Sequence, residues 1–217
     1  MASNKKKSYE DFIVRRFIYN DYAQGPPQNT YFNDNINNNN NTLKDFFNLI
    51  VESNKKCFPT ENGVDYTIEN MFSQNMDLFV VFYRPDNNYC GHASVTYNRH
   101  LSELTGDQET IGIGNIIWNV CIHPNARGHG LCQYIISTIT DGMAGYLSLS
   151  KSNHHTQNFW LGVFSDNIPA IKCYESCGFS KMGLSEIKHK RFDEIGKYVD
   201  EINIIYMFFC KQSLLKK

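Results

Sequence analysis

The stretch from Asn119 to Tyr134 constrains the fold more than any other part of the chain. It reads Asn-Val-Cys-Ile-His-Pro-Asn-Ala-Arg-Gly-His-Gly-Leu-Cys-Gln-Tyr and follows a run rich in isoleucine and valine. That run predicts a strand ending at His123-Pro124, because proline cannot donate to a strand ladder. Apolar residues at helical spacing predict a helix after Gly130. Strand, glycine loop and helix start together gather unpaired backbone N–H groups, so we expect an anion-binding loop.

Two well-known phosphate-binding motifs do not fit this loop. A nucleotide P-loop needs Gly-x-x-x-x-Gly-Lys-Ser/Thr, and no lysine follows Gly130. A Rossmann fingerprint needs three glycines between strand and helix. Gly112 and Gly114 lie within the expected strand, and Ile117 stands where the third glycine should be. Both interpretations are therefore excluded.

The loop does match most of another pattern, Arg/Gln-x-x-Gly-x-Gly/Ala, and the chain here resembles the GNAT superfamily of acyl-CoA N-acyltransferases. The matching residues are Arg127-Gly128-His129-Gly130-Leu131-Cys132, in which only Cys132 departs from the pattern. The second GNAT pattern, Asn-x-x-Ala-x-x-x-Tyr-x-x-x-Gly-Phe, is matched downstream by Asn167, Ala170, Tyr174, Gly178 and Phe179. Two independent motifs in the right order are far more specific than either alone.

The resemblance implies an α/β (α+β) fold with a twisted, mixed but mostly antiparallel sheet. Such a sheet has about seven strands flanked by about four helices, and it splays between strands 4 and 5 to admit the pantetheine arm. Periodicity agrees in element order: it predicts strands over 12–19, 78–83, 92–97, 111–122, 160–164, 179–184 and 202–210. It predicts helices over 43–58, 68–72 and 130–146 and around Tyr174, and polar loops over 102–109 and 188–197.

Length and composition indicate one globular domain. We expect a flexible tail over residues 1–10 and a single domain over 11–212 with an asparagine-rich loop insertion at about 24–41. The formal net charge of −1 gives no reason to expect a nucleic-acid partner. No apolar stretch approaches the ~20 residues that span a bilayer, so we expect no membrane association and a cytoplasmic location.

The cysteines predict neither a disulfide framework nor a metal site. There are seven, an odd number, without paired spacing, so we expect reduced thiols. Cys173 and Cys177 stand four apart on one expected helix but have no companion Cys-x-x-Cys pair. We expect no bound metal.

The resemblance also implies which residues hold acetyl-CoA, the acetyl donor of the family. The backbone of Val120, Cys121 and Ile122 would pair with the pantetheine amides. The loop residues implied in pyrophosphate binding are Arg127, Gly128, His129, Gly130, Leu131, Cys132 and Gln133. Arg127 either adds charge to this loop or pairs at the surface, and Cys132 is larger than the usual glycine or alanine. Asn167, in the second motif with Ala170, either bridges to the cofactor or caps its helix.

Acetyl transfer to an amine needs a proton for the departing thiolate, and Tyr174 is our candidate general acid. The unperturbed tyrosine pKa of ~10 lies close to the ~8.5 of a thiol; the alternative role for Tyr174 is packing on one face of its helix. Many GNAT enzymes carry a glutamate on the strand before the loop, but no carboxylate lies between Thr110 and Ile122. His123 and Glu109 are therefore the candidate bases, alongside a water relay.

Three functions follow from these observations. The first is an acetyl-CoA-dependent N-acetyltransferase acting by direct attack in a ternary complex. The second is a non-catalytic GNAT-like module that binds acyl-CoA, and the third is a thiol hydrolase with a Cys-His pair. The sequence does not identify the acceptor beyond a small-molecule or peptide amine. It is compatible with a homodimer.

Overall fold

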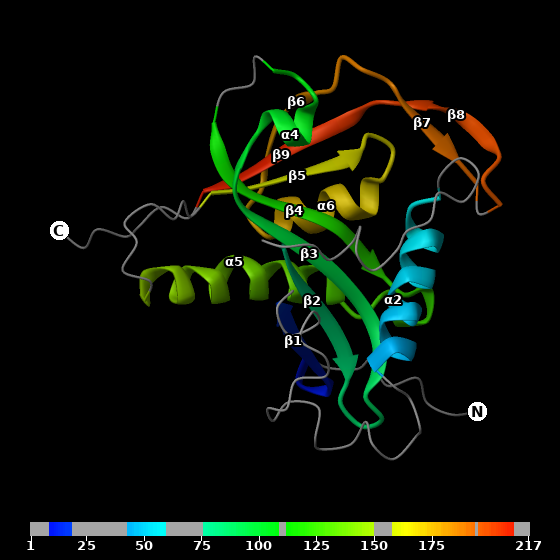
Figure 1. Cartoon of the computed structure of the whole chain (residues 1–217), viewed down its shortest axis with the longest axis vertical. Coiled ribbons are helices and arrows are strands. Elements are labelled where there is room, and N and C mark those ends of the chain that lie inside the picture. Colours follow the sequence, from blue (N-terminus) through cyan, green and yellow to red (C-terminus); the bar gives the residue numbers. More distant parts are fainter. Residues whose placement is uncertain are drawn as a thin grey trace.

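The computed structural model describes residues 9–18, 43–59, 76–108, 112–149, 158–193 and 195–210, and its elements are arranged around one large sheet (Figure 1). The strands of this sheet are β1 (Phe12–Ile18), β2 (Met76–Tyr83), β3 (Asn88–His100), β4 (Ile113–Ile122), β5 (Asn158–Phe164), β6 (Ser180–Leu184) and β9 (Ile204–Cys210). The helices are α2 (Leu43–Cys57), α4 (Ser102–Thr105), α5 (Leu131–Leu149) and α6 (Ile168–Ser176), with short 3-10 turns η1 (Tyr9–Asp11) and η4 (Pro124–Ala126).

The seven strands lie in the order β1-β2-β3-β4-β5-β9-β6. Every neighbouring pair is antiparallel except β4 and β5, which are parallel. The predicted mixed, mostly antiparallel sheet is thereby confirmed.

The two faces of the sheet carry separate hydrophobic cores, as the alternation of side chains along a strand requires. On β2, Leu78, Val80 and Phe82 cluster with Phe47 and Ile50 of α2. The intervening residues of β2 belong to the other cluster, together with the apolar stripe of α5 and with Tyr174 of α6. Helix α2 therefore covers one face, and α5 and α6 cover the other.

The sheet opens between β4 and β5, as predicted. The two strands pair only where Asn115 meets Phe159 and Ile116 meets Trp160. Beyond that point β5 continues its pairing with β9, from Asn158 to Phe164, whereas β4 follows β3. The register of β3 and β4 shifts near Asn119, whose φ of 53° lies in the left-handed region, so a bulge bends β4 where the strands part.

The two predicted polar loops contain regular structure instead. Residues 102–105 form α4, which ends at Gly106. Most of 188–197 belongs to a hairpin of β7 (His189–Phe192) and β8 (Tyr198–Ile202), a separate two-stranded sheet. The turn of this hairpin forms because Asp193 Oδ1 accepts hydrogen bonds from the backbone N–H groups of Ile195 and Lys197. Charged side chains on short exposed strands hide the period-2 signal.

The prediction that all cysteines are reduced is wrong for this structure. Cys57 of α2 is bonded to Cys121 of β4, and Cys132 of α5 is bonded to Cys173 of α6. The partners lie 64 and 41 residues apart in sequence, so local spacing could not reveal them.

The expected helix at 68–72 and the asparagine-rich insertion fall outside the described residues. Within the described part of the chain, no helix is both long and apolar enough to cross a membrane.

Candidate active site

The end of β4 presents one backbone edge toward the opening of the sheet. On the β3 side, Cys121 is paired with His92 and Ile122 with Gly91. On the other side, the register with β5 ends at Ile116, so the residues from Ile117 onward have no β5 partner. A strand edge of this kind offers N–H and C=O groups to an extended, amide-containing ligand. The three residues predicted to hold pantetheine, Val120, Cys121 and Ile122, lie along it.

The turn after β4 is fixed by backbone and side-chain hydrogen bonds. The backbone N–H of His123 donates to the carbonyl of Cys90, and His123 Nδ1 accepts from the N–H of Asn125 at 3.4 Å. This ring nitrogen therefore caps η4, which favours a structural role for His123 over that of a general base. Arg127 is exposed, and its Nε donates to the carbonyl of Ile122 at 3.2 Å. This contact pairs Arg127 within its own loop and leaves its charge beside the glycines.

Two glycines shape the loop in which the pyrophosphate was predicted to bind. Gly128 and Gly130 have φ values of 81° and 74°, a conformation that strains other residues. A Cβ added at Gly128 would meet no atom within 4 Å, so the space beside this residue is open. Helix α5 begins at Leu131, whose side chain is buried, and the N–H groups of its first turn have no partner within the helix. These residues fit an anionic ligand.

His129, the residue between the glycines, points into the protein. Its ring lies 6.0 Å from that of Phe12, and its Nδ1 is buried without a hydrogen-bond partner among the described residues. It lines a cavity of about 290 Å³ together with His123 and Asn125 of the turn after β4, Asp86 of the β2–β3 turn and Asn88 at the start of β3. The side chain of His129 thus packs beneath the loop.

The first turn of α5 is joined to α6 by two side-chain links. One is the disulfide between Cys132 and Cys173, whose Cα atoms lie 6.4 Å apart. The other is a hydrogen bond of 2.5 Å from Gln133 Nε2 to Ser176 Oγ. The side chain of Cys132, larger than the usual glycine or alanine, is held between the two helices by the disulfide.

The second motif forms α6 as predicted. Asn167 caps the helix, since its Oδ1 accepts from the N–H of Ala170 at 3.3 Å. Tyr174 is 5% exposed, and its ring lies 6.2 Å from that of Phe179. Burial, with a smaller contribution from Cys177, raises the pKa of Tyr174 well above its usual value. A tyrosine in this environment stays protonated at neutral pH and so has a proton to donate.

No carboxylate lies on β4, and Glu109 falls outside the described residues. A titratable side chain does lie beside the end of β4: His92 of β3 is paired with Cys121. It is completely buried: Nδ1 lies 2.6 Å from the hydroxyl of Tyr89 and Nε2 lies 3.2 Å from Asn54 Oδ1. An amide oxygen can only accept, so Nε2 carries the proton and Nδ1 accepts from Tyr89. Burial lowers the pKa of His92 to about 3, so His92 is a neutral link between the sheet and α2.

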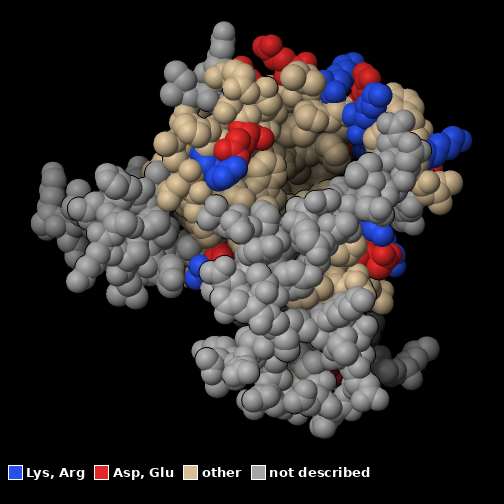
Figure 2. Space-filling model, in the orientation of Figure 1, with Lys and Arg blue, Asp and Glu red and all other residues tan. Residues whose placement is uncertain are grey.

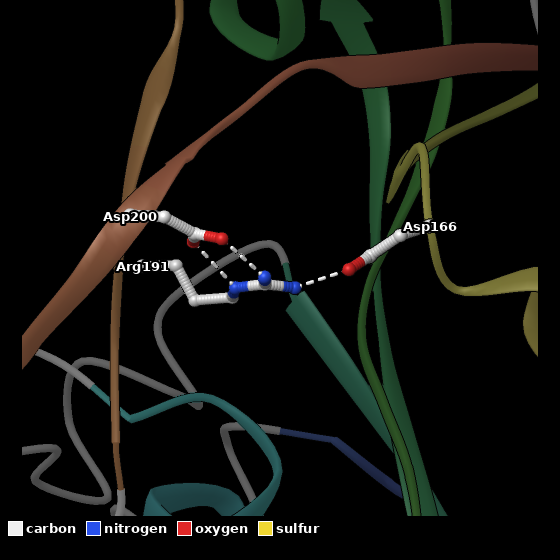
Figure 3. A network of polar contacts seen from close by, with 3 residues as sticks. All are labelled: Asp166, Arg191 and Asp200. Carbon is white, nitrogen blue, oxygen red and sulfur yellow. Dashed lines mark hydrogen bonds and ion pairs between the residues drawn. The ribbon is translucent and has the colours of Figure 1, made fainter.

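The Arg191 side chain links the two strands of the β7–β8 hairpin to each other and to the turn after β5. Arg191 of β7 donates to both carboxylate oxygens of Asp200 on β8, at 2.8 and 2.6 Å, and also pairs with Asp166 in the turn after β5 (Figure 3). Asp166 directly precedes the helix cap Asn167. The surface is hollowed next to a group of charged side chains at upper right (Figure 2), the side on which Figure 1 places β7 and β8. The sequence did not predict this triad, because Arg191 and Asp200 meet only when β7 pairs with β8, and Asp166 lies 25 residues before Arg191.

The sequence also gave no sign that Tyr9 reaches the loop. Its hydroxyl lies 3.4 Å from both the carbonyl oxygen of Gly130 and Oε1 of Gln133. Its ring is stacked on that of Tyr134, with centroids 5.4 Å apart and an interplanar angle of 20°. Tyr9 and Glu10, placed by sequence in the flexible tail, form part of η1.

Comparison with solved structures shows the same fold. A chimera of the spermidine N-acetyltransferase SpeG from Vibrio cholerae and hSSAT superposes with a TM-score of 0.56 at 15% identity, covering 95% of this chain and 99% of that one. The Vibrio cholerae spermidine N-acetyltransferase in complex with CoA and spermine gives a TM-score of 0.54 at 16% identity, covering 92% of this chain and 95% of its own. A dodecameric structure of the Vibrio cholerae enzyme gives 0.54 at 13% identity, with coverage of 95% and 98%.

No curated protein matches the chain by sequence search. A family model does match, over residues 43–179, and its description is the acetyltransferase (GNAT) family. The matched segment includes the loop after β4 and the whole of α6, and it spans well over half of the chain. The chain therefore belongs to the acetyltransferase (GNAT) family.

Proposed function

We propose that the chain is an acetyl-CoA-dependent N-acetyltransferase that moves an acetyl group to an amine in a ternary complex. The observation that carries this proposal is the place where β4 leaves β5. The free edge of β4 runs directly into the glycine loop and the first turn of α5. One extended ligand with amides at one end and a pyrophosphate at the other would satisfy both features.

The residues divide into binding and chemical roles. Backbone groups of Val120, Cys121 and Ile122 bind the pantetheine amides. The loop residues Gly128, His129, Gly130, Leu131, Cys132 and Gln133 hold the pyrophosphate through backbone N–H groups, with Arg127 adding charge nearby. Asn167 and Ala170 fix the start of α6. Acetyl-CoA supplies the activated thioester.

Tyr174 is the proposed general acid. The hydroxyl is protonated at neutral pH, so it can deliver a proton to the sulfur as the thiol leaves; burial raises its pKa and makes it a weaker acid than an exposed tyrosine. The acceptor amine must lose its own proton, and the described part of β4 has no carboxylate to take it. A water relay to solvent fits this arrangement. Alignment of the reactants can lower the barrier by up to ~7–11 kcal/mol, so transfer does not depend on a strong base.

A non-catalytic acyl-CoA-binding module is the second candidate, and the absence of a carboxylate on the described residues of β4 favours it. Release of free CoA thiol from acetyl-CoA distinguishes the two. The assay should include spermidine, an aromatic amine and a peptide with a free amino terminus, because solved relatives of the same fold include spermidine N-acetyltransferases. Acceptor-dependent thiol release with mass-detected acetylation supports the enzyme. Tight binding of acetyl-CoA with no transfer to any acceptor supports the module.

A further inference from the structure

The N-terminal turn η1 (Tyr9–Asp11) contacts the glycine loop at the residue that is least able to carry a side chain. A Cβ added at Gly130 would lie 2.4 Å from the hydroxyl oxygen of Tyr9. Gly130 is favoured by its own φ of 74°, and a side chain there would displace the Tyr9 hydroxyl. A contact across 121 residues of sequence thus brings an aromatic ring to the loop.

The contact of Tyr9 does not involve the N–H groups at the start of α5. The Tyr9 hydroxyl meets the carbonyl of Gly130 and the side chain of Gln133, which lie on the flank of the first turn. The N–H groups of that turn point toward the helix start, where an anion would bind. Tyr9 therefore lies beside the predicted pyrophosphate position.

The stacked pair of Tyr9 and Tyr134 offers a flat surface. Tyr134 lies one helical turn into α5, because its N–H donates to the carbonyl of Gly130. One face of the Tyr9 ring is covered by Tyr134, yet Tyr9 remains 48% exposed. The ring is also held by two polar contacts of its hydroxyl, so little conformational freedom remains to be lost when a ligand stacks on it.

The face of the loop toward α6 is closed, and the Gln133 side chain lies between that face and Tyr9, since its Oε1 meets the Tyr9 hydroxyl and its Nε2 donates to Ser176. There the disulfide of Cys132 and Cys173 and the hydrogen bond of Gln133 to Ser176 join α5 to α6. A nucleotide leaving the loop on that side would meet side chains that are already bonded to one another. On the N-terminal side it meets an exposed aromatic face within about one helical turn, or ~5 Å, of the loop.

We propose that Tyr9, supported by Tyr134, is the stacking platform for the adenine ring of CoA. This inference rests on the proposed function, because it concerns the nucleotide end of the same ligand. A purine ring has a π-face of the right size, and stacking on an aromatic side chain needs no base-specific hydrogen bonds.

The test compares two ligands that differ in the nucleotide. Calorimetry gives the dissociation constants of CoA and of 4′-phosphopantetheine, which lacks the adenosine portion, and their ratio reports what the nucleotide contributes. Tyr9→Ala should reduce this ratio by roughly 5- to 150-fold, the range expected for one stacked base. Tyr9→Phe keeps the ring and should preserve the ratio. Tyr198→Ala removes a comparably exposed tyrosine from β8 and should also leave the ratio unchanged.

The outcomes separate the two proposals. If the unaltered chain binds CoA and Tyr9→Ala leaves the ratio intact, the platform does not exist, although the proposed function survives. An equal loss of affinity for both ligands would give Tyr9 a purely structural role and would also overturn the platform. If the unaltered chain does not bind CoA at all, the proposed function fails and this inference fails with it.

Discussion

Cys132, in the first turn of α5 directly after the glycine loop, is covalently bonded to Cys173, the residue that directly precedes Tyr174 on α6. The loop proposed to hold the pyrophosphate and the helix that carries the proposed acid are therefore one mechanical unit. The second disulfide, between Cys57 and Cys121, joins α2 to the predicted pantetheine strand. Both bonds include a residue of the proposed cofactor site.

The bond between Cys132 and Cys173 should contribute measurably to stability. Cys173→Ser should lower the free energy of unfolding by roughly 2–4 kcal/mol, the usual effect of losing a disulfide. The double variant Cys132→Ser/Cys173→Ser should lose no more than the single one, because both changes remove the same bond. Denaturation in urea without a reducing agent measures these values, and Cys210→Ser, an exposed free thiol, is the control.

Thiol titration of the unfolded, unreduced protein checks the same bond independently. We expect three reactive thiols, those of Cys90, Cys177 and Cys210. Seven reactive thiols, or additive losses in the double variant, would contradict the pairing.

A side chain at Gly128 should weaken cofactor binding, in addition to straining the backbone at that position. Gly128→Leu places a side chain in the open space beside the loop and should weaken acetyl-CoA binding at least about tenfold, or about 1.4 kcal/mol. Gly106→Leu is the matched control, because Gly106 has a φ of 72° and also has no atom within 4 Å of an added Cβ. Both changes should lower the melting temperature by similar amounts. Equal acetyl-CoA affinity in the two variants would place the pyrophosphate elsewhere.

Replacement of Tyr174 should affect turnover and leave binding intact. Tyr174→Phe keeps the packing against Phe179 but removes the proton, so we expect kcat to fall roughly 100-fold with little change in KM for acetyl-CoA. Tyr89→Phe is the control: Tyr89 is also a tyrosine whose pKa is raised by burial, but it lies outside the proposed site. Undiminished turnover in Tyr174→Phe would remove Tyr174 as the acid.

His92 should make the fold sensitive to mild acid. Its folded pKa, about 3, lies below the unfolded value of 6.5, so the unfolded chain binds the proton first. Stability is therefore full above pH 6.5 and declines as the pH falls toward 3. Between pH 7 and pH 5 this group alone should remove about 2 kcal/mol.

Urea unfolding at several pH values measures this slope. His92→Gln should flatten it, whereas His100→Gln, a change at an exposed position of β3, should not. An equally steep acid decline in His92→Gln would assign the effect to other groups.

Arg191 should hold the β7–β8 hairpin in place without dominating global stability, since its ion pairs with Asp166 and Asp200 are partly exposed. In Arg191→Gln we expect faster hydrogen exchange of the backbone amides across 189–202 and an almost unchanged melting temperature. Arg99→Gln breaks the exposed pair with Glu103 and is the control. Unchanged exchange across the hairpin in Arg191→Gln would show that the triad does not restrain it.

The sequence was most informative where local rules decide the structure. Pro124 after a β-branched run, the glycines of the loop, and the cap at Asn167 each act within a few residues, and all three features lie where they were predicted. The parting of β4 from β5 was implied by the resemblance and is confirmed.

What escaped prediction depends on contacts between distant segments. No local pattern pairs Cys132 with Cys173 or brings Tyr9 to Gly130, because these partners meet only after the sheet has formed. The β7–β8 hairpin was missed for a different reason: its strands carry charged residues on exposed positions, and short polar strands resemble loops in sequence.

The central claim, that acetyl-CoA binds along β4 and the glycine loop, is tested most directly by thermal unfolding with acetyl-CoA, with adenosine diphosphate and NAD as controls. A ligand at ~100 times its Kd stabilises by ~2.7 kcal/mol, which for a chain of this size raises the melting temperature by roughly 5–10 °C. We predict a shift of that size for acetyl-CoA and none for NAD. No shift at saturating acetyl-CoA would contradict the account.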